Sequence, residues 1–257
     1  MLLAIDVGNT NMVFGLFREE ELIGTFRLTT DANRTADEIG LTVCQYFHRF
    51  HIDMDSVEDI IIASVVPQMM YTLKHAMLKY FEKKPLIIDE DIFPNLMYEE
   101  EERLGADRSV CCDAAIEKYG KPLIVLDFGT ATTVDAISDT GWYLGGCILA
   151  GLQTTTEALF SKAAQLPQIE LVKPPTVLAR DIVGQIQGGC IAGYIGTIEH
   201  LVQETKREMG YGNSVKVVAT GGLAQVIAKN TKQIDCVDDQ LILDGLLLLY
   251  KKHKQTI

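Results

Sequence analysis

The sequence predicts an α/β protein made of two similar halves, each a mixed β-sheet flanked by helices. Three observations support this prediction. The apolar run, turn and apolar run at residues 2–16 recur at residues 123–137, at an offset of 121. Strand-like and helix-like apolar patterns alternate along both parts of the chain. The length of 257 residues exceeds one typical domain, so we expect halves at 1–115 and 116–257.

The first half opens with a predicted β-hairpin. An apolar run at 2–5 is followed by the turn Gly8–Asn11 and a second apolar run at 12–17. Thr35, with a glutamate three residues later, has the capping-box pattern and predicts a helix that runs through Phe50. The other elements expected here are strands at 22–29, 59–66 and 85–88, a helix at 68–81 that follows the strand-stopping Pro67, and a helix that begins near Ser109.

The second half repeats the hairpin at 123–137, and residues 142–146 continue it as a third strand. A proline pair at 174–175 then separates two helical stretches. The elements expected after the hairpin are helices at 154–164 and 181–209, a strand at 215–219, a helix from about 223 and a last helix at 240–252.

Composition excludes several functional classes. A net charge of −12 and a pI near 4.8 argue against nucleic-acid binding, which needs a basic face. The opening apolar run is too short for a signal peptide and no segment has about 18 consecutive apolar residues, so we expect a cytoplasmic protein that does not bind membranes. The six cysteines and five histidines show no metal-ligand spacing, so we expect no transition metal.

The duplicated turn carries the chemistry. The sequence contains neither a Walker motif nor a G-x-G-x-x-G motif, but Asp6-Val7-Gly8 and Asp127-Phe128-Gly129 each end a predicted strand. A glycine there lets the backbone approach a phosphate, and an aspartate can hold a cation. One such turn is usually only structural. Two copies at matched positions favour a nucleotide clamp of the actin-like ATPase type, and Ala219–Gly222 has the order of strand end and glycine pair that this superfamily places against adenosine.

Five blocks together make the resemblance specific. The chain resembles type III pantothenate kinases, which carry an Asp-x-Gly-Asn-Thr-Asn opening, a Gly-Ala-Asp-Arg block, an Asp-x-Gly-Thr-Ala-Thr-Thr block, a glycine pair and an Ala-Thr-Gly-Gly block in this order. Here these blocks are Asp6–Asn11, Gly105–Arg108, Asp127–Thr133, Gly145-Gly146 and Ala219–Gly222. The match in order and spacing extends over essentially the whole chain. The resemblance implies two ribonuclease-H-like halves with a nucleotide cleft between them, and a homodimer.

The resemblance also implies roles for individual residues. Asp107 would be the general base that accepts the proton of the primary hydroxyl of pantothenate, and Asp127 would hold the monovalent cation, K⁺ or NH₄⁺. The pantothenate site would include Tyr98, Gly105, Ala106, Asp107 and Arg108, the last suited to a carboxylate. The phosphates of ATP, bound with Mg²⁺, would lie against Asp6, Val7, Gly8, Asn9, Thr10, Asn11, Met12, Val13 and Thr130.

The sequence departs from the family pattern on the acceptor side. Ile182 stands where the family has a threonine that contacts pantothenate, and Glu100-Glu101 stand where it commonly has Asn-Pro. A smaller departure is Ala150-Gly151-Leu152 in place of Pro-Gly-Ile. Two alternatives to pantothenate phosphorylation therefore stay open: a kinase of another small hydroxy compound, and a weakly active paralogue that binds nucleotide as a regulatory protein.

Overall fold

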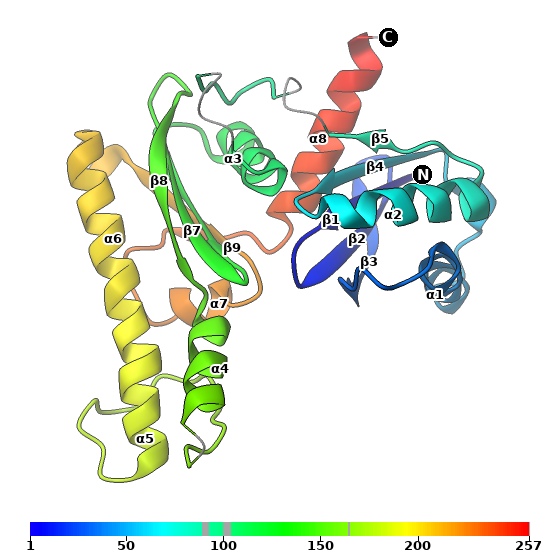
Figure 1. The fold of residues 1–257 in the computed structure, drawn as a ribbon. Coiled ribbons are helices and arrows are strands. Elements are labelled where there is room, and N and C mark those ends of the chain that lie inside the picture. The colour runs from blue at the N-terminus through cyan, green and yellow to red at the C-terminus, as the bar shows by residue number, and fades with distance from the viewer. Residues whose placement is uncertain (89–92, 100–103, 164, 257) are drawn as a thin grey trace. The chain divides into compact units, whose positions relative to one another are not determined.

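The computed structural model describes residues 1–88, 93–99, 104–163 and 165–256. The chain divides into two compact units (Figure 1). The first contains Met1–Ala114 and the segment from Leu241 onward, and the second contains Ala115–Gln240. No helix in the described part of the chain is both long enough and apolar enough to cross a bilayer.

The first unit has a five-stranded sheet in the order β3-β2-β1-β4-β5. Strands β1, β2 and β3 form an antiparallel meander, and β4 and β5 run parallel to β1. The strands are β1 (Leu2–Val7), β2 (Asn11–Arg18), β3 (Glu21–Thr29), β4 (Asp59–Ser64) and β5 (Leu86–Ile87).

The second unit has a sheet with the equivalent order, β8-β7-β6-β9-β10. Again the first three strands along the chain are antiparallel and the last two run parallel to the first. The strands are β6 (Leu123–Phe128), β7 (Ala131–Ile137), β8 (Tyr143–Ala150), β9 (Lys216–Thr220) and β10 (Cys236–Val237). The predicted fold class, two similar halves with mixed sheets, is confirmed.

The two hairpins differ by one residue in their turns. Phe14 lies opposite Ile5 in the first hairpin, and Val134 lies opposite Leu126 in the second. The first strands are thus related by an offset of 121 (126 − 5) and the second strands by 120 (134 − 14). Because the second turn is one residue shorter, Thr10 corresponds to Thr130.

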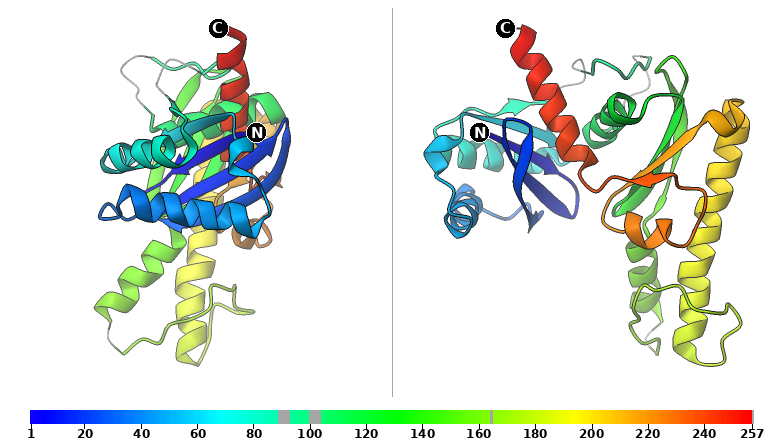
Figure 2. Two further views of the ribbon diagram at one scale, coloured as in Figure 1. Left: turned by 90° about the vertical axis from the view of Figure 1, so that its right-hand side faces the viewer. Right: turned by 180° about the vertical axis from the view of Figure 1, so that it is seen from behind.

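Helices α1 (Ala36–Arg49) and α2 (Pro67–Phe81) pack side by side on one face of the first sheet (Figure 2). The predicted capping box is present, since the Thr35 hydroxyl accepts from the N–H of Glu38 and the Glu38 carboxylate accepts from the N–H of Thr35. Pro67 is the first residue of α2, where its missing N–H costs no hydrogen bond.

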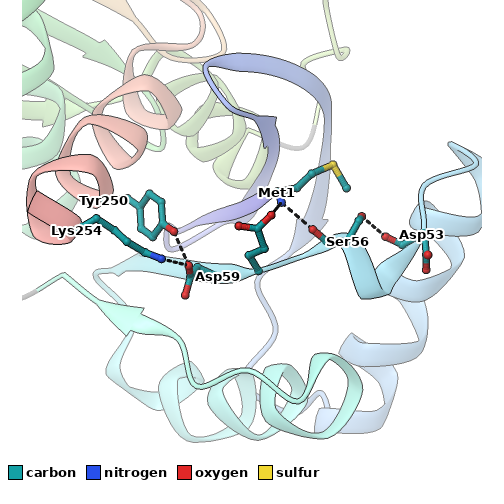
Figure 3. A network of polar contacts seen from close by, with 7 residues as sticks. Met1, Asp53, Ser56, Asp59, Tyr250 and Lys254 are labelled. Atoms are coloured by element: carbon teal, nitrogen blue, oxygen red, sulfur yellow. Dashed lines mark hydrogen bonds and ion pairs between the residues drawn. The ribbon is translucent and has the colours of Figure 1, made fainter. Parts of the chain in front are cut away.

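Helix α8 (Leu241–Thr256) covers the opposite face of this sheet and so belongs to the first compact unit, whereas the prediction from the sequence placed all of 116–257 in one half. Strand β1 explains this, because its side chains alternate between two faces. Leu3 and Ile5 pack with α1 and α2, whereas Leu2 and Ala4 pack with apolar side chains of α8. At its far end α8 is held through Tyr250 and Lys254, which both contact the carboxylate of Asp59 (Figure 3).

The remaining helices differ from the expected ones mainly at their ends. Helix α3 (Ala106–Tyr119) begins three residues before the predicted Ser109, so Asp107 lies in its first turn. The predicted long helix at 181–209 is present as α5 (Ile182–Gln187), a π-helical segment at 188–192 and α6 (Gly193–Met209). The others are α4 (Leu152–Lys162), α7 (Ala224–Ala228) and short 3₁₀ turns at Met54–Ser56 and Gly212–Ser214.

Candidate active site

The first turn presents a row of polar side chains at the end of β1. The N–H of Gly8 donates to the carbonyl of Asn11 at 3.1 Å, and the N–H of Thr30 donates to the carbonyl of Thr10 at 2.9 Å. The Thr30 hydroxyl donates to the carbonyl of Gly8 at 2.7 Å. These bonds use main-chain atoms of the turn, while the side chains of Asn9, Thr10 and Asn11 are exposed. The turn is therefore fixed in shape and polar on its outside, as a phosphate cradle requires.

Not every residue of the predicted cradle can act through its side chain. Val7 and Met12 are fully buried and belong to the core that packs against α1 and α2, and Val13 is half-buried. Any contact of Val7 or Met12 with a phosphate would therefore use the main chain. Asp6 is half-buried at the end of β1.

The second turn is packed more tightly. The N–H of Gly129 donates to the carbonyl of Ala131 at 3.1 Å, and the carbonyl of Thr130 accepts from the N–H of Gly151 and from the Thr154 hydroxyl at 3.0 and 2.7 Å. A Cβ atom at Gly151 would lie 2.3 Å from the carbonyl oxygen of Gly129. The position after β8 must therefore be glycine for the chain to approach this turn. Of the departures noted in the sequence, the Ala150-Gly151-Leu152 block thus keeps the residue that the turn needs.

The first glycine of the pair after β9 lies close to the Asp127 carboxylate. Gly221 has a φ of +92°, and a Cβ atom there would lie 2.4 Å from Asp127 Oδ1 and 2.7 Å from the main-chain N and C of Phe128. At the corresponding position of Gly222, no atom of the described residues other than its chain neighbours lies within 4 Å. Gly221 thus brings main chain against the Asp127 carboxylate, while Gly222 faces open space.

The Asp127 carboxylate is an oxygen donor of the kind that hard cations bind. Asp127 is half-buried, and its carboxylate lies beside main-chain atoms of residues 128 and 221. Carboxylate and carbonyl oxygens are ligands of K⁺ and Mg²⁺, whereas transition metals prefer nitrogen and sulfur. Within the described ranges, no three histidine, cysteine, aspartate or glutamate side chains form a metal-binding group. The Asp127 carboxylate can therefore supply one oxygen ligand of the kind that such a cation binds.

Asp107 lies in the first turn of α3, close to the end of β4. A Cβ atom at Gly105 would lie 2.7 Å from Asp107 Oδ1 and 3.4 Å from Val65 Cγ1. The Asp107 carboxylate accepts a hydrogen bond of 2.7 Å from the N–H of Arg108. Because β4 is parallel to β1, with Ala63 opposite Asp6, the carboxyl ends of both strands meet at one edge of the sheet. The structure thus brings Asp107 to the edge that carries Asp6 and the first turn.

A cavity of about 350 Å³ opens beside this helix start. Its walls are mainly apolar, with the hydroxyl groups of two serines among them, and sequence reasoning identified only Gly105 and Ala106 of its lining. The other lining residues are Ser64, Val65, Ile88, Phe93, Leu104 and Ser109. Ser64 and Val65 follow a strand that runs parallel to β1, and this topology was the available signal for them. Phe93 and Leu104 come from connections without a regular pattern.

Other predicted acceptor residues are not part of this lining. Tyr98 and Arg108 are half-buried in the first unit, near Phe93 and Ala106 in sequence. Ile182 belongs to the second unit, where it is 46% exposed as the first residue of α5, and the Asp181 carboxylate caps that helix by accepting from the N–H of Gly184. Glu100 and Glu101 lie outside the described residues.

A larger hollow of about 540 Å³ in the second unit contains none of the predicted residues. It is lined by Glu199, Gln203 and residues 229–233, which are polar side chains at the surface. The smaller cavity has the more apolar walls and contains the predicted acceptor residues Gly105 and Ala106.

Comparisons with known proteins agree on the fold. A structure from Campylobacter jejuni, of a protein assigned to the Baf family of transcriptional activators, has 20% identity and a TM-score of 0.62, and the match covers 98% of this chain and 99% of that one. A 2-hydroxyisocaproyl-CoA dehydratase activator from Clostridium difficile, with bound ADPNP, has 12% identity and a TM-score of 0.56, covering 100% and 97%. A protein from Sinorhizobium meliloti assigned as a 2-dehydro-3-deoxygalactonokinase has 12% identity and a TM-score of 0.58, covering 98% and 96%.

The family comparison is more specific than these structural likenesses. The model of the type III pantothenate kinase family matches residues 2–204, a range that includes both Asp-x-Gly turns and the Gly105–Arg108 block. This range covers well over half of the 257 residues. The chain therefore belongs to the type III pantothenate kinase family and is a kinase with a nucleotide-binding fold.

Proposed function

We propose that this protein transfers the γ-phosphoryl group of ATP to the primary hydroxyl of pantothenate, giving 4′-phosphopantothenate, the first step of coenzyme A synthesis. The observation that carries the proposal is the position of Asp107. Its carboxylate stands at the sheet edge that bears the first Asp-x-Gly turn, beside a cavity of about 350 Å³. A base, a phosphate cradle and an acceptor pocket thus occur together in one unit.

The two turns supply the nucleotide side. Asn9, Thr10 and Asn11 offer exposed amides and a hydroxyl to phosphate oxygens, and Thr130 corresponds to Thr10 in the second turn. ATP would enter with Mg²⁺, which neutralises the phosphate charge, and Asp127 would hold K⁺ or NH₄⁺. The ADPNP in the Clostridium difficile structure supports nucleotide binding by this fold.

The cavity matches the chemistry of pantothenate next to its reacting hydroxyl. That hydroxyl belongs to a CH₂ group attached to a carbon that carries two methyl groups, and Val65, Phe93 and Leu104 provide apolar walls for such a group. The hydroxyls of Ser64 and Ser109 are within the same lining. The Arg108 guanidinium is the group suited to the carboxylate of the substrate.

The reaction is a direct displacement. The hydroxyl oxygen forms a bond to the γ-phosphorus, the bond from that phosphorus to the β–γ bridging oxygen breaks, and ADP leaves with the bond's electron pair. Asp107 accepts the hydroxyl proton. The N–H of Arg108 donates to this carboxylate at 2.7 Å and helps to orient it. Phosphoryl transfer depends mainly on positioning and charge neutralisation, so one carboxylate suffices.

The test is pantothenate-dependent release of ADP with MgATP and K⁺, measured up to millimolar pantothenate. We expect turnover by the wild type and a loss of about 10²–10⁴-fold in Asp107→Asn, which keeps the shape but not the basicity. Asp55→Asn is the matched control, because Asp55 is an exposed carboxylate in the 3₁₀ turn Met54–Ser56. Near wild-type turnover by Asp107→Asn would show that the base assignment is wrong.

A second candidate function is phosphorylation of another small hydroxy compound, and Ile182 favours it. Its side chain cannot replace the hydrogen bond that the family threonine makes, and an unpaired buried group costs about 1–3 kcal/mol. If pantothenate is the acceptor, Ile182→Thr should lower its apparent KM at least about fivefold. If neither the wild type nor Ile182→Thr releases ADP with pantothenate, a screen of hydroxy acids and pantetheine-like amides should identify the acceptor.

A third candidate is a nucleotide-binding regulatory protein, which the likeness to the Campylobacter jejuni protein favours. Calorimetric binding of ATP without ADP release under any acceptor would support it. We further propose a cytoplasmic homodimer that completes the acceptor site from a second copy. Light scattering measures the dimer, and a monomer at micromolar concentration with full activity would exclude it.

A further inference from the structure

Asp113 is a buried carboxylate outside the predicted site. It lies on α3 and only 1% of its surface is exposed. Its Oδ1 atom accepts from the N–H of Asn95 at 2.7 Å and from the N–H of Leu96 at 3.0 Å, and Oδ2 accepts from Asn95 Nδ2 at 3.4 Å. A single carboxylate on a helix thus holds two successive main-chain groups of an irregular segment.

Such an arrangement has a large electrostatic cost. Burial raises the pKa of the Asp113 carboxyl, and the two main-chain hydrogen bonds and the charge of Lys252 on α8 only partly oppose this effect. A buried carboxylate that served only to fill space would be less favourable than an apolar side chain of similar size. The hydrogen bonds to residues 95 and 96 therefore explain why an oxygen acceptor, and not an apolar side chain, occupies this buried position.

The segment that Asp113 holds leads to the proposed acceptor pocket. Phe93 at its start lines the cavity, Leu96 is buried, and Tyr98 at its end is a predicted substrate residue. The helix that carries Asp113 begins with Ala106 and Asp107. One helix therefore carries the proposed base in its first turn and, six residues or about 1.7 turns later, the carboxylate that binds the segment 93–98.

We infer that Asp113 is a positioning residue that fixes the segment 93–98 relative to Asp107 and thereby sets the affinity for the acceptor. This inference rests on the proposed function, because the segment is assigned to the acceptor pocket. Asp113 does not touch the reacting atoms. Its loss should therefore weaken acceptor binding and leave the ATP-binding turns at Asp6–Asn11 and Asp127–Thr130 unchanged.

Three variants test the role in catalysis. Asp113→Ala strands two buried N–H groups, and we expect the acceptor KM to rise about tenfold or more while kcat falls less and the KM for ATP is unchanged. Asp113→Asn keeps an Oδ1 acceptor for both N–H groups, so its KM should stay within about threefold of the wild type. Asp53→Ala is the control, because Asp53 is exposed and accepts from only one N–H in the same unit.

Hydrogen exchange provides a readout that does not depend on the acceptor. In the wild type the amide hydrogens of Asn95 and Leu96 should exchange at least about tenfold more slowly than that of Glu99, because both are bonded to a buried carboxylate. Asp113→Ala should remove this protection and Asp53→Ala should not.

The outcomes separate the two claims. Fast exchange at Asn95 and Leu96 in the wild type would contradict the claim that Asp113 holds these residues, whether or not Asp113→Ala folds. Lost protection with an unchanged acceptor KM overturns the positioning role. If the wild type phosphorylates no pantothenate, the proposed function fails, while the exchange pattern still decides whether Asp113 holds the segment. Lost protection together with a raised KM and rescue by Asp113→Asn supports both.

Discussion

Gly221 and Gly222 are adjacent, but the structure assigns them opposite roles that alanine substitutions can separate. At Gly221 an alanine would adopt a φ of +92°, and its Cβ atom would meet Asp127 Oδ1 at 2.4 Å and the Phe128 main chain at 2.7 Å. At Gly222 the same atom would enter open space. The two variants therefore add the same methyl group to different surroundings.

The cost at Gly221 follows from two terms. The left-handed backbone costs an L-residue about 1–2 kcal/mol, and forcing a methyl group against atoms that cannot move away costs typically about 1–3 kcal/mol. Gly221→Ala should therefore lose about 2–5 kcal/mol of the free energy of unfolding, which lowers Tm by roughly 5–20 °C in a protein of this size. Gly222→Ala should stay within about 0.5 kcal/mol of the wild type.

Gly222→Ala, which should barely change stability, should instead be the variant that impairs nucleotide binding. If the open space at Gly222 receives the nucleotide, its methyl group occupies part of the ligand's volume. Thermal unfolding with and without a non-hydrolysable MgATP analogue measures both effects, because a ligand at 100 times its Kd stabilises the wild type by about 2.7 kcal/mol. We expect Gly222→Ala to keep its apo Tm and lose most of the ligand-induced shift. A full shift in Gly222→Ala, or a wild-type Tm in Gly221→Ala, would refute this reasoning.

Three further predictions concern the second unit. Gly151→Ala should destabilise by about 2 kcal/mol or more in thermal unfolding, because its methyl group would meet the carbonyl oxygens of residues 129 and 130. By contrast, Gly196→Ala should stabilise by about 0.5–1 kcal/mol, because Gly196 is exposed on α6 and no described atom outside its own helix turn and chain neighbours lies within 4 Å of the added methyl group; a loss of stability would contradict this open position. Burial opposes ionisation of Asp238, but hydrogen bonds from Lys118 and Tyr119 outweigh it and hold its pKa below the usual value. The stabilisation is therefore present above the unfolded pKa of about 3.9 and is lost as the pH falls through the folded pKa. In urea unfolding, Tyr119→Phe should lose about 1–2 kcal/mol at pH 7, and an undiminished difference at pH 2.5 would contradict the assignment.

The elements that could be predicted from the sequence are those whose signals are local. Thr35 and its partner three residues on determine where α1 begins, and Pro67 marks the start of α2, where its missing N–H costs no hydrogen bond. The two matched sheets could be predicted from the duplicated turns, because each strand, turn and strand follow one another directly in the sequence. The start of α3 was missed because Ala106–Arg108 shows no apolar periodicity, and its helical state depends on packing.

Tertiary contacts decide the features that the sequence could not provide. The apolar face of α8 is equally compatible with either unit, and only its packing on Leu2 and Ala4 of β1 shows which sheet it covers. The acceptor cavity likewise combines a strand end, a helix start and two connections, of which only Gly105 and Ala106 belong to a recognisable motif. Asp113 was overlooked for the same reason, because its partners lie in an irregular segment 17 and 18 residues earlier.

The duplicated fold explains how one architecture supplies two different surfaces. Ala63 pairs with Asp6 in the first sheet and Thr220 pairs with Asp127 in the second, so the next residues, Ser64 and Gly221, are equivalent. At this shared position the second unit has a glycine that lets the main chain approach Asp127, whereas the first unit has a serine that lines the cavity near Asp107. A glycine at residue 64 would remove a hydroxyl from the cavity, and a serine at residue 221 would push against the carboxylate. The two copies are therefore not interchangeable, and the difference at this one position agrees with the proposal of an acceptor beside Ser64 and a cation beside Gly221.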